Sequence, residues 1–362
     1  MTHKIPDLYY YTTIETMRFI LENGNIYATN LKYMNDSEEY SNGLIELKKI
    51  LNDKYIESKN TINQDKLNEY LNKHAESYSI SFSTQRDLLS QWSMYAGESG
   101  VSLKMNFQNP QEYCFYADKH DKRKGRTYSK KGIYPKRVYY ITESSMNSKD
   151  YKKVREKIEE DIEERLLAQG SVKKSDMEGE NAVDIWLDMT PYLKRYEFYQ
   201  EGEYRLAYSI YDSNFPLQID YRTSKHVLIP YLDVECKNGW PIEEIIVGPG
   251  DNQQVVFTSL THYMDNADLK VPFVKGSSYR KRCKEYFCKD KELPDAVQKI
   301  FRLYEKKLCS QNIDLRYGQL LELRESVLKS QEVDVEYKNY MLNRWLTKTG
   351  ILLTKSEIPY KY

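Results

Sequence analysis

The pattern of hydrophobic and polar positions predicts a chain of mixed strands and helices. Short segments rich in aromatic and β-branched residues, several with period-two alternation, predict strands. The predicted strands are residues 8–11, 25–31, 78–82, 100–107, 137–142, 204–211, 226–232, 242–247 and 351–360. Because they do not alternate regularly with helices, the pattern favours an α+β fold over a doubly wound parallel sheet.

Helical spacing of apolar residues is clearest directly after the first predicted strand. Thr12 or Thr13 caps this helix and Gly24 ends it. A long charged helix is predicted over 150–169, and 270–335 is strongly charged and mostly helical in pattern. The other predicted helices are 43–56, 65–75, 88–95, 182–193, a helix beginning at 255, and 337–349.

Composition and charge narrow the classes of function. Lys plus Arg and Asp plus Glu both number 54 in the 362 residues, so net charge gives no overall attraction to nucleic acid or membrane. No apolar run approaches the ~18 residues of a membrane span, and no apolar leader is evident, so we expect a cytoplasmic protein without membrane contact. The five cysteines match neither a zinc site nor a disulfide framework, and no metal site is predicted.

The run Glu201-Gly202-Glu203-Tyr204-Arg205 is the strongest candidate for chemistry. On a strand, residues two apart point to the same face, so Glu201, Glu203 and Arg205 are predicted to share one side. Arg205 would pair with a Glu or with a phosphate. The alternative is a cross-strand ladder of ion pairs on a solvated face.

Several short motifs occur in one order along the chain. They are Leu8-Tyr9-Tyr10-Tyr11-Thr12-Thr13, Met34-Asn35-Asp36 with Glu39, Ser81-Phe82-Ser83, Trp92 with Tyr95 and Ala96, the Glu201–Arg205 run, Gly248-Pro249, and Ser356-Glu357-Ile358-Pro359-Tyr360. In this combination the chain resembles a bacterial family of domains of unknown function with an ADP-ribosyltransferase-like fold, whose members are often found in toxin or anti-phage loci.

The resemblance implies a split mixed or antiparallel sheet with peripheral helices, and NAD as substrate. Glu203 would hold the ribose and support its positive charge, and Glu201 would orient the attacking group. The implied cofactor contacts are Tyr10, Tyr11, Thr12, Asn35, Asp36, Ser83, Tyr95 and Arg205. The chain departs from the family at Tyr10, where histidine is common.

The motif order also implies the domain organisation. Residues 1–264 and 334–362 form the ADP-ribosyltransferase-like domain, and 265–333 are a charged helical insertion that would serve as a partner surface. A rival alignment ends the domain at Arg280 and makes the remainder an appended unit.

Residues 117–137 read as a basic loop with interleaved tyrosines, a composition that suits nucleic-acid contact. The candidate contacts are Lys122, Arg123, Lys124, Arg126, Lys130 and Lys131. A solvated loop without a ligand is the alternative.

The leading hypothesis is an NAD-dependent ADP-ribosyltransferase that modifies a nucleic-acid or protein acceptor as a defence or toxin effector. The second is a non-catalytic module of the same fold that binds a nucleotide or a partner. An RNA 2′-phosphate-transferring enzyme, which also uses NAD, is a third.

Overall fold

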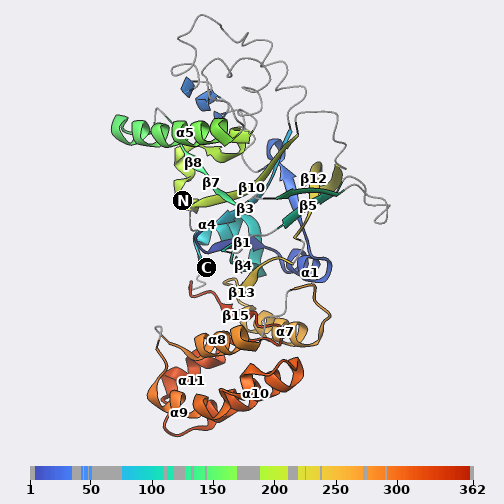
Figure 1. Cartoon of the computed structure of the whole chain (residues 1–362), viewed down its shortest axis with the longest axis vertical. Coiled ribbons are helices and arrows are strands. Elements are labelled where there is room, and N and C mark those ends of the chain that lie inside the picture. The colour runs from blue at the N-terminus through green and yellow to red at the C-terminus, as the bar shows by residue number, and fades with distance from the viewer. Residues whose placement is uncertain are drawn as a thin grey trace, which may run out of the picture.

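The computed structural model describes residues 5–34, 42–43, 45–47, 49–50, 76–108, 112–116, 127–131, 134–142, 145–168, 188–210, 219–224, 226–236, 239–271, 276–289 and 292–358. Its centre is a mixed sheet that has thirteen strands within these residues, in the order β14-β15-β13-β4-β1-β3-β2-β12-β5-β6. Strands β10 and β11 pair with β3 and β12, and β7 pairs with β10 (Figure 1).

The strands of this sheet are β1 (Leu8–Thr12), β2 (Asn25–Asn30), β3 (Glu76–Ser83), β4 (Val101–Met105), β5 (Glu112–Tyr116), β6 (Thr127–Lys131), β7 (Lys136–Arg137), β10 (Glu203–Ile210), β11 (Asp220–Ser224), β12 (Val227–Cys236), β13 (Ile242–Val247), β14 (Trp345–Leu346) and β15 (Leu352–Lys355). Neighbours run antiparallel except β13 and β15, which are parallel. A small second sheet pairs β8 (Tyr139–Tyr140) in parallel with β9 (Leu193–Lys194).

The sheet divides at β3, and this division positions the site. One edge of β3 pairs with β10 along its whole length. The other edge pairs with β1 only at Ser83 and with β2 only at Tyr78 and Ser79. Strands β1 and β2 therefore diverge beside Ile80–Phe82, and the gap between them opens the sheet into two halves.

Helix α1 (Ile14–Asn23) joins the two diverging strands, as its capping residues predict. The Thr13 hydroxyl accepts a hydrogen bond from the Thr16 amide at 3.2 Å. Gly24 ends the helix in the left-handed conformation with φ of 78°. Met17, Ile20 and Leu21 are its buried positions, and they pack into the large core on the sheet.

The remaining helices lie at the periphery. They are α4 (Leu89–Gln91), α5 (Ser148–Ala168), α7 (Gln253–Asn266), α8 (Gly276–Phe287), α9 (Asp295–Tyr304), α10 (Ile313–Lys329) and α11 (Val335–Leu342). Short 3-10 segments are η1 (Leu31–Tyr33), η3 (Gly97–Ser99), η5 (Thr190–Tyr192), η6 (Tyr196–Glu201) and η7 (Lys307–Cys309), and η2 (Trp92–Ala96) is a π-helix.

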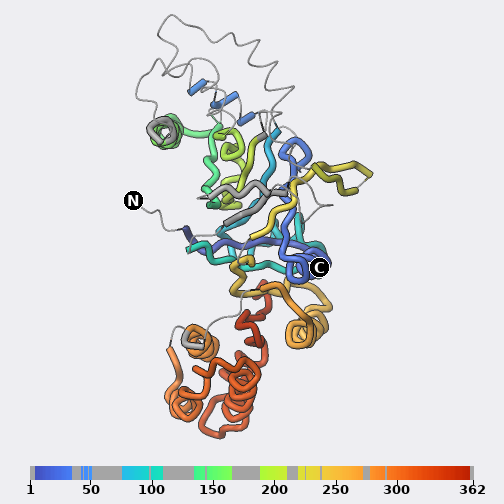
Figure 2. Tube along the Cα trace, turned by 45° about the vertical axis from the view of Figure 1, so that its right-hand side comes forward, coloured from blue at the N-terminus to red at the C-terminus, as the bar shows by residue number. Residues whose placement is uncertain are grey.

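Helices α8 to α11 form a helical unit at one end of the long axis of the molecule, with α5 at the opposite end (Figures 1 and 2). They share a core of their own that includes Tyr279, Phe301, Leu323 and Tyr337. The chain then returns to the central sheet through β15. The helical unit thus interrupts the sheet domain, and it extends through α11, beyond residue 333.

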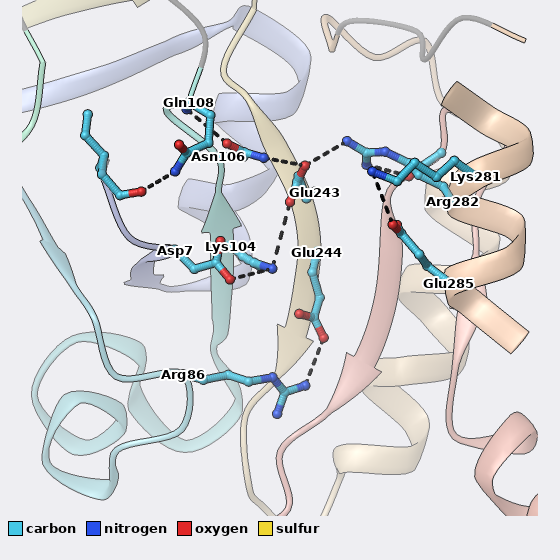
Figure 3. A network of polar contacts seen from close by, with 12 residues as sticks. Asp7, Arg86, Lys104, Asn106, Gln108, Glu243, Glu244, Lys281, Arg282 and Glu285 are labelled. Atoms are coloured by element: carbon cyan, nitrogen blue, oxygen red, sulfur yellow. Dashed lines mark hydrogen bonds and ion pairs between the residues drawn. The ribbon is translucent and has the colours of Figure 1, made fainter. Parts of the chain in front are cut away.

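Polar contacts join the helical unit to the sheet. Glu243 on β13 accepts hydrogen bonds from Asn106 at 2.9 Å and from Arg282 of α8 at 3.2 Å, and Lys104 lies 3.8 Å from the same carboxylate (Figure 3). Arg282 also donates to the Gly350 carbonyl at 2.9 Å. Glu243 therefore links β13 to the first helix of the unit.

Four sequence predictions of local structure need correction. The basic segment predicted as a loop contains strands β6 and β7, since β6 pairs with the preceding strand β5 and β7 pairs with the distant strand β10. The helix predicted over 337–349 ends at Leu342 and is followed by β14. In the segment predicted as a helix over 182–193, Leu193 begins β9. Strands β5 and β11 were not predicted, since neither has an apolar alternation. The helix predicted over 65–75 lies outside the described residues.

Candidate active site in the divided sheet

A cavity of about 620 Å³ lies where the sheet divides. Strands β1, β2 and β3 and helix α1 supply most of its lining, and η2, β10 and β11 contribute from other parts of the chain. Pockets that bind small molecules and cofactors have volumes of roughly 300–1,000 Å³. The cavity is thus large enough for a nucleotide-sized ligand.

Most of the predicted catalytic and cofactor-binding residues meet at this cavity. Seven of them line it: Tyr10, Tyr11, Thr12, Ser83, Tyr95, Glu201 and Glu203. Arg205 is not in the lining, and its side chain is buried against Glu203. Asn35 and Asp36 lie outside the described residues, although the neighbouring Met34 does line the cavity.

The two glutamates converge for a reason other than the predicted one. They do not share a strand: Glu201 ends the 3-10 segment η6, and Glu203 begins β10. Gly202 between them has φ of 53°, in the left-handed region. A Cβ at this position would lie 2.2 Å from the Thr84 hydroxyl oxygen, so the turn requires glycine.

Lys194, which the sequence analysis did not single out, bridges the two carboxylates. Its Nζ lies 2.9 Å from Oε2 of Glu201 and 3.0 Å from Oε2 of Glu203. The ammonium also lies 5.0 Å from the centre of the Phe198 ring. Lys194 is only 6% exposed, so this is a buried triad and not a solvated ion pair.

Arg205 completes the charge balance of the cluster. Its Nε donates to Oε1 of Glu203 at 2.7 Å, its Nη2 donates to Oε2 at 3.0 Å, and its Nη1 donates to the Pro191 carbonyl at 2.7 Å. A bidentate guanidinium contact of this kind is strong and directional. With two anions and two cations, the cluster is formally neutral, and Arg205 is committed to Glu203.

Glu203 stays ionised in this environment. Burial alone would raise its pKa, but the charges of Arg205 and Lys194 outweigh burial and lower the pKa of Glu203 to about 2. Its backbone amide donates to the Tyr140 hydroxyl at 2.6 Å. A carboxylate held in place and ionised can stabilise positive charge that develops beside it.

Two of the predicted cofactor contacts use their hydroxyl groups within the protein. The Ser83 hydroxyl donates to the Glu201 carbonyl at 2.6 Å and accepts from the Gln85 amide at 3.0 Å. The Tyr11 hydroxyl donates to the Gln85 carbonyl at 2.7 Å and accepts from the Leu88 amide at 3.1 Å. Both side chains therefore hold the segment that follows β3 beside the cavity.

Tyr10 occupies the position where the resembled family commonly has histidine. It is half-buried in the cavity wall, with its ring centre 5.9 Å from that of Phe82. Burial raises the pKa of Tyr10, so its hydroxyl is protonated at neutral pH and can donate a hydrogen bond.

The other motifs of the resemblance hold the cavity wall in place. Trp92 is buried and contacts Tyr11 edge to face, with ring centres 4.7 Å apart. Asp87 accepts hydrogen bonds from Trp92 Nε1 and from the Ser356 hydroxyl, each at 2.7 Å. A Cβ at Gly248 would come within 2.9 Å of the Trp92 ring. These motifs are thus explained by packing around β1.

The opposite end of the cavity carries a positive charge that the sequence analysis missed. Arg222 on β11 lines the cavity, and its Nη2 donates to the Thr29 hydroxyl of β2 at 3.3 Å. Phe19 and Tyr27 form an aromatic wall nearby, with ring centres 5.0 Å apart. Only the pairing of β11 with β12 brings Arg222 here, and no local sequence signal predicts that pairing.

The predicted nucleic-acid contacts are placed only in part. Lys130 and Lys131 lie on β6, the last strand of the sheet order, and not on a loop as predicted. Lys122, Arg123, Lys124 and Arg126 lie outside the described residues. Among the residues that the structure describes, no helix has the length and apolar character needed to cross a membrane.

Comparisons of the chain with protein-family models, curated proteins and solved structures find no match.

Proposed function

We propose that the protein binds NAD in the cavity of the divided sheet and transfers its ADP-ribosyl group to an acceptor. The observation that carries the proposal is the meeting of three distant sequence motifs at one cavity. Tyr10 to Thr12, Tyr95, and the Glu201 and Glu203 pair all line it, although up to about 190 residues separate them. The cavity volume suits a dinucleotide.

In the proposed reaction the bond between nicotinamide and ribose breaks. Its electron pair leaves with nicotinamide, and the ribose carbon becomes positively charged. Ionised Glu203 would stabilise this charge, because a fixed carboxylate in a buried site acts on it with little screening. The acceptor then attacks the same carbon and gives up a proton to water, and Glu201 lies beside Glu203 to orient that acceptor.

The acceptor class is part of the proposal. The basic strand residues Lys130 and Lys131 support a nucleic acid, and a protein is the alternative acceptor. A role as a defence or toxin effector follows from the family resemblance alone.

The test is incubation of the purified protein with NAD labelled on its adenylate, in lysate with and without nuclease. Wild type should transfer the label, and Glu203→Gln should lose at least about 100-fold of this activity, the scale on which removing one electrostatic contact to a transition state acts. Equal transfer by Glu203→Gln would overturn the catalytic assignment. Loss of labelled product on nuclease treatment would identify a nucleic-acid acceptor.

A matched control is available on the same sheet. Glu244 is a buried carboxylate on β13 that pairs with Arg86 at 2.8 Å, and it is not in the cavity lining (Figure 3). Glu244→Gln should retain label transfer. This control separates loss of a reacting carboxylate from loss of any buried ion pair.

One observation favours a second candidate function, a non-catalytic nucleotide-binding module. Lys194 lies within 3.0 Å of both carboxylates and offsets the negative charge that catalysis would use. This candidate predicts that NAD binds without release of nicotinamide. Nicotinamide release from NAD by wild type therefore separates the two functions.

A further inference from the structure

The charges along the cavity are distributed unevenly. Glu201 and Glu203 lie at the end near Ser83, and Glu15 lies at the start of α1. Among the described lining residues, Arg222 is the single lysine or arginine. A ligand that spans the cavity therefore meets carboxylates at one end and a guanidinium at the other.

The register of the strands gives the separation of these two ends. Glu203 is opposite Ser83 on β3, and Thr29, the partner of Arg222, is opposite Ser79. Four residues along a strand correspond to roughly 13 Å at ~3.3 Å per residue. An extended ligand is needed to contact both ends.

The guanidinium of Arg222 has N–H donors that a ligand can use. Within the described part of the chain its guanidinium donates only to the Thr29 hydroxyl, and no carboxylate pairs with it. A guanidinium has five N–H donors in a planar fork that matches phosphate oxygens. Thr29 holds one edge of that fork over the cavity, and Ser224 on the same strand adds a hydroxyl to the lining.

We infer that Arg222, held by Thr29, binds a phosphate group of the ligand, so that the cavity selects phosphorylated nucleotides over nucleosides and free bases. This inference rests on the proposed function and adds an orientation to it: the phosphates lie toward β11 and the bond that breaks lies toward Glu203. The aromatic wall of Phe19 and Tyr27 then lies beside the phosphate end, where it can contact a base.

The experiment is a calorimetric titration of the full chain with ADP and with adenosine, its phosphate-free counterpart. Wild type should bind ADP at least about tenfold more tightly than adenosine, the scale of one charge-assisted hydrogen bond. Arg222→Gln should remove this preference and leave adenosine affinity unchanged. Arg222→Lys, which keeps the charge but loses the fork, should retain part of it.

Two further readouts sharpen the test. In wild type, the ratio of the affinities for the phosphorylated ligand and for adenosine should fall at high salt. In Arg222→Gln, this ratio should not change with salt. Arg18→Gln removes an arginine of α1 that pairs with Glu22 outside the cavity, and it should behave as wild type.

A wild-type preference that survives in Arg222→Gln would overturn the inference, as would the absence of any preference in wild type. Failure of the proposed function is distinguishable from both outcomes. An Arg222-dependent preference in a protein that releases no nicotinamide from NAD would support the phosphate site and exclude the transferase.

Discussion

Removal of the Lys194 ammonium is the most informative perturbation of the buried cluster. In Lys194→Met, Glu203 keeps both contacts to Arg205, but Glu201 loses the cation 2.9 Å from its carboxylate. Removing one partner of a buried ion pair destabilises a protein by about 3–5 kcal/mol, because the remaining charge is buried without compensation. The Glu201 side chain retains 11% exposure, so we expect the lower end, about 3 kcal/mol.

The assay is equilibrium unfolding in urea at pH 7, followed by circular dichroism. With a slope of about 3 kcal/mol per molar urea, the midpoint should fall by about 1 M. Glu201→Gln alone should cost less, since Lys194 still pairs with Glu203. The double variant Lys194→Met with Glu201→Gln should recover at least about 1 kcal/mol relative to the sum of the single changes.

Additivity of the two changes within about 0.5 kcal/mol would contradict this expectation, because it would show that the two side chains do not interact. Lys281→Met is the control. Lys281 is on the exposed surface of α8, 3.7 Å from Glu285 (Figure 3), and its loss should have little measurable effect.

Two further predictions concern the residues beside Lys194. The pKa of Glu203 is lower in the folded protein, about 2, than its ordinary value of 4.5, so its stabilising effect is complete above pH ~4.5 and is lost as pH falls toward 2. The pKa difference corresponds to roughly 3 kcal/mol of unfolding free energy. Glu203→Gln should therefore flatten the dependence of unfolding free energy on pH between about 5 and 2. An unchanged slope would contradict the ionised, ion-paired state assigned to Glu203. Gly202→Ala should destabilise the fold by about 2 kcal/mol or more in urea unfolding, since a Cβ there strains a left-handed backbone and meets Thr84. Gly24→Ala is the control, since Gly24 is also left-handed but a Cβ there would come no closer than 3.8 Å to Lys270, and an equal cost in both variants would show that the contact with Thr84 does not matter.

Local sequence signals predicted the elements that depend on local chemistry. Thr13 and Gly24 predicted both ends of α1, because a side-chain cap and a left-handed glycine are set by neighbouring residues. The apolar pattern of residues 242–247 predicted β13, because this pattern is also a property of neighbouring residues.

The parts of the site that depend on tertiary pairing were not predictable in this way. Lys194 directly follows the segment predicted as a helix over 182–193 and was assigned to no element, whereas it lies on β9, which exists through its pairing with β8. Arg222 has no local signal, and β11 is defined by its pairing with β12. The meeting of Glu201 and Glu203 was predicted from strand alternation, but the turn at Gly202 produces it. Contacts made by residues distant in sequence decide each of these positions.

The central claim is that NAD binds in the cavity between the diverging strands β1 and β2. Hydrogen exchange with and without saturating NAD tests this directly, since bound ligand slows exchange in the segments that it covers. Bound NAD should slow exchange in residues 8–12, 25–30 and 79–83 and leave exchange in α8 to α11 unchanged. No change in those three segments, or slower exchange confined to the helical unit, would contradict it.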